Sequence, residues 1–279
     1  MQILSYMKID VRIHLSTYKP PFFIGSMLRG VLGNALKQVS CINPSYQCEG
    51  CFALRECLYY KFYEEKNTFH AFRLGIIMQP KTLDFSLYLF ENSVKTLPYM
   101  LSAIKKGLEE LGVGKEQAKQ RITTIKIAGQ TVYDGVEFLS LNAISPSRLE
   151  IDGFSRDVTL QFNMPIRIKE HNRLARKGFE LPTLINSIHH RYRQLKGEES
   201  SRLGYQIHGE IVESHLKFVE MQRFSSRQKS RMNLGGLKGT IKITGLDKRS
   251  YVYLKIGEVI GAGKQTVFGL GSYVVKEEK

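Results

Sequence analysis

The first half of the chain alternates between two kinds of hydrophobic pattern. In residues 2–16, Val11, Ile13 and Leu15 alternate with polar side chains, which predicts a strand with one face in water. Elsewhere apolar residues recur every three or four positions, as they do on an amphipathic helix. The pattern predicts strands over residues 2–16, 69–78, 82–90 and 121–128, and helices over residues 22–39 and 93–112. This β-α-β-β-α-β order is the ferredoxin-like arrangement.

The second half repeats the same order of elements. Its pattern predicts strands over residues 158–168, 216–224, 234–244 and 267–275, and helices over residues 181–197 and after Asp247. Between the halves, residues 140–156 show no periodicity and contain Pro146 and Gly153, which places the domain junction there. We therefore predict an α+β chain of two tandem ferredoxin-like (RRM-like) domains, over residues 1–140 and 153–279.

The last predicted helix and strand are joined by a glycine-rich stretch, residues 257–273, with five glycines in seventeen residues and Lys264 at its tip. Glycine has no Cβ, so a phosphodiester could lie against the backbone N–H groups of such a loop. The order helix, loop, strand does not fit the phosphate-binding motifs in which a strand leads into a helix. Two interpretations stay open at this point, a ligand-binding loop and an ordinary glycine-rich αβ turn.

The net charge of the chain indicates a polyanionic partner. The 279 residues include 41 Lys and Arg against 26 Asp and Glu, a net charge of +15, and most of the excess lies in residues 146–279. Nucleic acid is the leading partner. An anionic membrane surface is the rival, but the basic residues do not lie along one long amphipathic helix. The sequence has no run of 18 apolar residues and no signal-peptide pattern at residues 1–8, so we expect a cytoplasmic protein.

All the cysteines fall in one short segment, residues 41–57, with the spacing C-x6-C-x2-C-x5-C. In a reducing compartment such clustering indicates a metal site rather than disulfides. Four thiolates can surround a tetrahedral zinc ion, which we expect to have a structural role. An iron–sulfur cluster is the alternative, because the first spacing is loose for a zinc knuckle. The predicted ligands are Cys41, Cys48, Cys51 and Cys57.

Motifs in both halves resemble a known family. They are residues 261–271 (GAGKQTVFGLG), residues 223–228 (RFSSRQ) leading into residues 234–239 (LGGLKG), and residues 27–33 (MLRGVLG) with the four cysteines and Tyr60. Together they resemble the CRISPR-associated endoribonucleases of the RAMP superfamily that process precursor CRISPR RNA, in particular members associated with type III systems. The resemblance covers nearly the whole chain.

The resemblance implies that the chain binds CRISPR repeat RNA and cuts it without a catalytic metal. In that reaction a ribose 2′-hydroxyl attacks the adjacent phosphate and leaves a cyclic phosphate. Many family members place a general-base histidine on or just after the first helix, but residues 22–60 contain no histidine. The alternative is therefore a non-catalytic RAMP-type RNA-binding subunit, with the subunits of a CRISPR effector complex as partners. A third interpretation is a redox sensor built on an iron–sulfur cluster.

Candidate site residues follow from the chemistry of RNA cleavage. Histidine can accept the 2′-hydroxyl proton or protonate the leaving oxygen near neutral pH. We expect His190 on the wet side of its helix and His189 on the flank, and His14 on the polar face of the first strand is the reserve. The predicted catalytic residues are His189, His190 and His14. The predicted RNA-binding residues are Arg223, Arg227, Lys229, Arg231, Gly261, Gly263, Lys264, Gln265, Gly269 and Gly271.

Overall fold

The computed structural model of the chain describes residues 4–15, 18–66, 68–76, 83–142, 144–199, 201–225 and 230–278. The chain divides into two compact units, Ser5–Arg148 and Leu149–Lys279, the latter also taking in Met1–Leu4. The division lies inside the predicted junction at residues 140–156. None of the described helices is long and apolar enough to cross a membrane.

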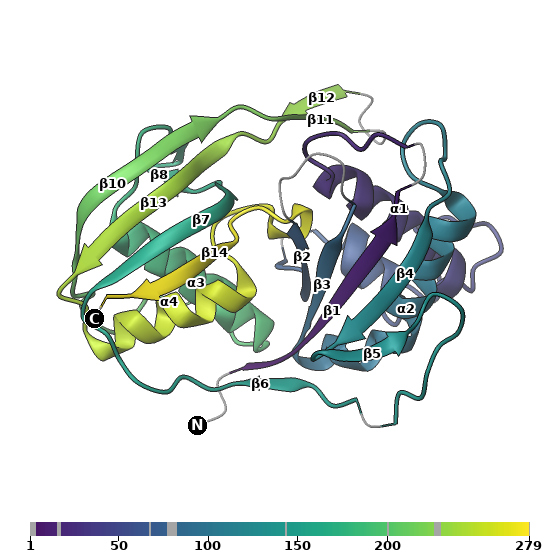
Figure 1. Cartoon of the computed structure of the whole chain (residues 1–279), viewed down its shortest axis with the longest axis horizontal. Coiled ribbons are helices and arrows are strands. Elements are labelled where there is room, and N and C mark those ends of the chain that lie inside the picture. Colours follow the sequence, from purple (N-terminus) through teal and green to yellow (C-terminus); the bar gives the residue numbers. More distant parts are fainter. Residues whose placement is uncertain are drawn as a thin grey trace. The chain divides into compact units, whose positions relative to one another are not determined.

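The first unit is built on an antiparallel sheet with the strand order β2-β3-β1-β4-β5 (Figure 1). Its strands are β1 (Leu4–His14), β2 (Phe72–Ile76), β3 (Phe85–Phe90), β4 (Arg121–Ile127) and β5 (Gln130–Tyr133), and β6 (Ser147–Leu149) also pairs with β1. The first four strands have the order of a ferredoxin-like sheet, in which the first and third strands are central. The prediction for this half is confirmed, and β5 and β6 are additions to it.

Two helical stretches cover one face of this sheet. They are α1 (Gly25–Ser40) and a continuous run made of η2 (Glu91–Thr96), α2 (Leu97–Lys105) and η3 (Lys106–Leu111), and a further turn, η1 (Tyr60–Glu64), follows the cysteine loop. The buried side of α1 carries Leu28, Leu32 and Leu36. Gly112, with φ 76°, ends the second stretch as the sequence predicted.

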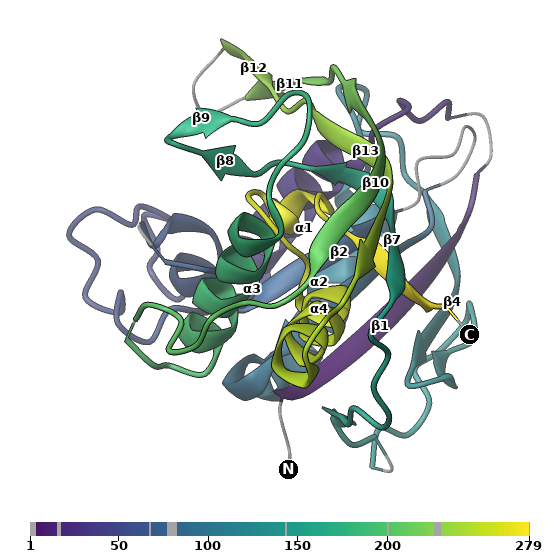
Figure 2. The same cartoon turned by 90° about the vertical axis from the view of Figure 1, so that its left-hand side faces the viewer.

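The second unit repeats the arrangement, with the strand order β10-β13-β7-β14 and all pairs antiparallel. Its strands are β7 (Val158–Ile166), β10 (Glu210–Val219), β13 (Gly236–Thr244) and β14 (Tyr273–Glu277), and its helices are α3 (Leu181–Leu195) and α4 (Lys248–Ile260). The two helices lie side by side on one face (Figure 2). Asp247 caps α4, because its Oδ1 accepts the N–H of Ser250 at 2.7 Å. The tandem ferredoxin-like fold is therefore confirmed.

One predicted strand, over residues 216–224, is interrupted. β10 starts earlier than predicted, at Glu210, and ends at Val219, and the chain resumes as β11 (Gln222–Ser225), which pairs with β12 (Ser230–Asn233). The backbone O of Met221 accepts the N–H of Leu234 at 2.8 Å between these segments, so β11–β12 continues the β10–β13 pairing in the same register. A second hairpin, β8 (Lys169–Glu170) with β9 (Arg173–Leu174), was not predicted. The predicted strand segments at residues 77–78 and 82 lie outside the described residues.

The glycine loop between α4 and β14 is fastened to the end of β7 by backbone hydrogen bonds. The N–H of Lys264 donates to the O of Arg167 at 2.7 Å, and the N–H of Gly271 donates to the O of Pro165 at 3.0 Å. A Cβ on Gly271 would lie 1.8 Å from the backbone O of Ala262, and its φ of 69° is unfavourable for any side chain. Gly271 therefore permits a close approach within the loop, between its own backbone and that of Ala262.

We expect Gly271→Ala to destabilise the second unit by at least about 3 kcal/mol, because the clash with backbone adds to the strain of positive φ. The midpoint of urea unfolding measures the effect. Gly153→Ala is the matched control, because Gly153 has a similar φ of 78° and nothing within 4 Å of the added Cβ. Equal losses in the two variants would show that the close approach contributes nothing.

Candidate functional site

The glycine loop presents few of its own backbone groups to a ligand. Gly261, Gly263, Gly269 and Gly271 are all buried. The N–H of Gly261 donates to the O of Gly257 at 2.8 Å, and that of Gly263 donates to Ser187 Oγ at 3.0 Å. The expectation that these N–H groups cradle a phosphodiester is therefore corrected, because they already have acceptors within the protein.

The accessible part of the loop is its tip. Lys264 is exposed and Gln265 is half-buried, with a left-handed φ of 66° at Gln265. The Oε1 atom of Gln265 is buried and has no hydrogen-bond partner among the described residues. The tip can therefore offer one ammonium group, while the glycines behind it hold the loop in place.

The β11–β12 hairpin places a second cation at this loop. The guanidinium carbon of Arg223 lies 4.7 Å from the ring centroid of Phe268, and Arg223 Nη2 lies 3.1 Å from Met232 Sδ. Two other predicted cations, Arg227 and Lys229, lie outside the described residues, and for Arg231 only the backbone in β12 is described. The structure thus brings Arg223 to the loop that carries Lys264.

Sequence reasoning missed a third cation, Arg167, at the end of β7. Its guanidinium donates to the backbone O of Gly235, and its own backbone O accepts the N–H of Lys264. Burial lowers the pKa of Arg167. A guanidinium group nevertheless stays protonated in proteins. Its role depends on strands far apart in the sequence, so no local motif could have indicated it.

His189, predicted on the flank of its helix, is buried. It is 5% exposed, with Nδ1 2.9 Å from the hydroxyl of Tyr253 and Nε2 3.1 Å from the backbone O of Ser201. Because a carbonyl can only accept, Nε2 carries the proton and Nδ1 accepts from the tyrosine. Burial, above all, lowers the pKa of His189 and keeps it neutral. This geometry suits a structural histidine.

His190 is half-buried and faces a different environment. It lines an open pocket of about 730 Å³ between α3 and residues 202–207, together with Asn186, Arg202 and Tyr205. A histidine and an arginine thus share one accessible pocket. His14, at the exposed end of β1, pairs across the sheet with Arg121.

The cysteine loop follows α1 directly. The N–H of Cys41 donates to the O of Lys37 at 2.9 Å, and the N–H of Cys51 closes the Cys48–Cys51 turn on the O of Cys48 at 3.3 Å. All the cysteines are half-buried free thiols. Tyr59 and Tyr63, which follow the loop in the sequence, stack on each other with ring centroids 5.6 Å apart.

The Cys48 thiol has charged groups and two of the other thiols around it. Burial raises the pKa of Cys48, Lys37 lowers it, and Glu64, Cys57 and Cys41 raise it further. In the part of the chain that the structure describes, no three His, Cys, Asp or Glu side chains are arranged to hold a metal ion. The donor set, four thiols on one loop, suits zinc, and the ligand geometry is not formed.

Two family models match the chain. One, AF_1859_N, described as an N-terminal domain, matches residues 3–144, and the other, described as CRISPR-associated endoribonuclease Cas6, matches residues 160–273. An uncharacterised protein of Archaeoglobus fulgidus is 24% identical over 293 residues, which cover 98% of each chain.

Solved structures show the same fold. A Cas6 from Thermus thermophilus is similar with a TM-score of 0.58 and 12% identity over 98% of both chains. The protein of a Cas6-related gene from Pyrococcus furiosus has a TM-score of 0.53 and 15% identity, over 99% of this chain and 100% of that one. The chain therefore has an AF_1859_N domain over residues 3–144 and a match to the CRISPR-associated endoribonuclease Cas6 model over residues 160–273, and it shares the fold of these solved structures along its whole length.

Proposed function

We propose that the chain binds CRISPR repeat RNA in precursor transcripts and cleaves it without a catalytic metal. The observation that carries the proposal is the cluster of Lys264, Arg223 and Arg167 around the glycine loop, within the region that matches the Cas6 family model. Cations spaced around a rigid loop suit the phosphates of RNA. One of the similar solved structures is described as a Cas6 product complex, with a TM-score of 0.60.

The proposed chemistry is transesterification. A ribose 2′-oxygen attacks the adjacent phosphorus while a general base takes its proton, and the bond from phosphorus to the 5′-oxygen breaks as that oxygen is protonated. The upstream fragment then ends in a 2′,3′-cyclic phosphate. His190 is the histidine that we assign to proton transfer, because it is accessible and shares its pocket with Arg202, whose charge can neutralise the phosphorane.

The test of cleavage uses purified protein and its own repeat RNA in EDTA. We expect a product with a cyclic phosphate end or its opened form, and we expect His190→Ala to slow single-turnover cleavage by about 10²–10⁴ with RNA affinity unchanged. Zinc content is measured after EDTA treatment, so that loss of a structural metal is not mistaken for loss of a catalytic one. His215→Ala is the matched control, since the His215 side chain is 75% exposed on β10 of the same unit.

Two outcomes would redirect the assignment. If the His190→Ala variant cleaves at the parental rate, His190 is not the proton-transfer residue, and His14 would be tested next. A parent protein that binds the repeat RNA and never cuts it would favour the second candidate, a non-catalytic RNA-holding subunit of an effector complex. Two observations favour that candidate, namely that residues 22–60 contain no histidine and that both ring nitrogens of His189 are occupied.

The cation cluster gives a separate prediction on binding. Lys264→Ala and Arg223→Ala should each weaken RNA affinity and lower the slope of log affinity against log salt by about 0.7, because each removes one single-stranded phosphate contact. Filter binding over a salt series measures both quantities. Lys276→Ala is the control, because Lys276 is an exposed lysine of β14. Unchanged affinity and slope in the first two variants would contradict this RNA surface.

The cysteine loop carries a structural proposal, one zinc ion held by Cys41, Cys48, Cys51 and Cys57, with an iron–sulfur cluster as the alternative. We expect elemental analysis of protein purified under reducing conditions to find one zinc per chain. Cys51→Ser should lower both the metal content and the melting temperature, because thiolate binding contributes directly to folding. Phe52→Ala, next to Cys51 and 77% exposed, should change neither. Protein that contains neither zinc nor iron would refute the site.

A further inference from the structure

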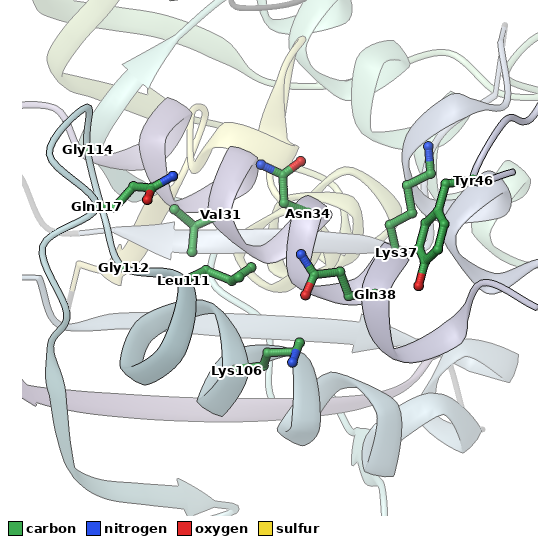
Figure 3. Close-up of a pocket in the computed structure, with 10 residues that line it drawn as sticks. All are labelled: Val31, Asn34, Lys37, Gln38, Tyr46, Lys106, Leu111, Gly112, Gly114 and Gln117. Carbon is green, nitrogen blue, oxygen red and sulfur yellow. The ribbon is translucent and has the colours of Figure 1, made fainter. Parts of the chain in front are cut away.

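A second open pocket lies wholly within the first unit, with a volume of about 740 Å³ (Figure 3). Its walls are the outward side of α1, the cysteine loop, and the end of η3 with the turn that follows. The volume falls in the range of small-ligand sites, about 300–1,000 Å³. None of the cations around the glycine loop lines it, and neither does His190.

Backbone packing shapes one wall of this pocket. η3 touches α1 at Gly107, where a Cβ would lie 2.9 Å from a methyl carbon of α1. Gly112 then turns the chain, and its Cβ would lie 2.1 Å from the backbone O of Gln117. Backbone hydrogen bonds of 2.9 and 3.0 Å between Val113 and Ala118 close that turn. The wall is therefore fixed before any ligand arrives.

Tyr46 stands at one end of the pocket, beside Lys37 (Figure 3). Its φ is 53°, and its N–H donates to the O of Asn43 at 3.0 Å. The side chain of Asn43 holds the same turn, since Nδ2 donates to the O of Gln47 at 2.9 Å and Oδ1 accepts from the N–H of Ser45 at 3.0 Å. The ring is 47% exposed. An aromatic face held in place by a rigid turn is suited to stack on a nucleobase.

The remaining polar groups fit the other parts of a nucleotide. Asn34 and Gln38 are exposed amides one turn apart on α1, and each offers a donor and an acceptor for a base edge. Lys106 pairs with Glu110 at 2.8 Å on the surface, a weak contact that a phosphate can replace. Among the described residues that line the pocket there is no Asp or Glu, so Glu110, the partner of Lys106, is the acidic group that a bound phosphate would displace.

We propose that this pocket binds one unpaired ribonucleotide, with its base on Tyr46 and against the amides of Asn34 and Gln38, and its phosphate at Lys106. A stacking face, paired donors and acceptors, and an ammonium group in one hollow correspond to the three chemical parts of such a ligand. Where the nucleotide belongs to the repeat RNA, the inference rests on the proposed function. A free nucleotide has the same chemistry, and the experiment separates the two sources.

The test titrates the full chain, by calorimetry, with each nucleoside monophosphate and with a short unstructured RNA oligonucleotide. Tyr46→Ala should weaken binding by about 5- to 150-fold, the effect of losing one stacked base. Tyr46→Phe should bind as the parent does, because the ring face is kept. Lys106→Met should weaken binding and reduce its salt dependence. Binding of monophosphates points to a free nucleotide, and binding of the oligonucleotide alone points to a position within RNA.

The matched control is Tyr99→Ala, which removes a tyrosine that is 51% exposed on α2 of the same unit, outside the pocket. The inference fails if the parent binds neither ligand, if Tyr46→Ala binds as the parent does, or if Tyr99→Ala loses as much affinity. Cleavage of repeat RNA is followed in parallel. If the parent protein does not cleave RNA and still shows binding that depends on Tyr46, the proposed cleavage function is refuted while the nucleotide pocket is supported.

Discussion

The second unit depends on a close approach between backbone segments at the end of β7. Gly263 and Gly236 both pack where an added Cβ would lie 2.5 Å from a β7-side carbonyl, that of Arg167 for Gly263 and that of Ile166 for Gly236. No side chain fits in either gap, so two glycine motifs far apart in the sequence meet on the same strand end. These glycines do not themselves contact a ligand. By packing closely they hold the loop tip, which carries Lys264, against the end of β7, which carries Arg167.

In the glycine loop, backbone packing and positive charge are supplied by different residues. The glycines satisfy their own N–H groups within the protein, which removes the free energy cost of burying them. The positive charge comes from side chains on three different elements, the loop tip, the β11–β12 hairpin and the end of β7. Two of these cations have a defined contact, Arg223 with the ring of Phe268 and Arg167 with the carbonyl of Gly235. The glycine loop is therefore held by backbone packing, while the positive charge around it comes from side chains.

The first unit has a different character. Its cysteine loop and the turn after η3 enclose a polar hollow beside α1, and the same loop carries the thiols and Tyr46. Gly33 of α1 lets the ring of Tyr63 pack closely against the helix, since a Cβ on Gly33 would lie 2.6 Å from that ring. The two ferredoxin-like units thus share one order of strands while presenting unrelated groups to a ligand.

The sequence by itself determined the element order and the two-fold repetition of the fold, because hydrophobic periodicity is a local property of the chain. It also named Lys264, Arg223 and His190 as candidate site residues, and their roles stay predictions. Tertiary structure alone decided that His189 is enclosed by Tyr253 and Ser201 and that Arg167 donates to the backbone O of Gly235. It also decided that the N–H groups of the loop glycines donate to acceptors within the protein. Each of these outcomes joins residues distant in the sequence, and such contacts form only when whole elements pack together.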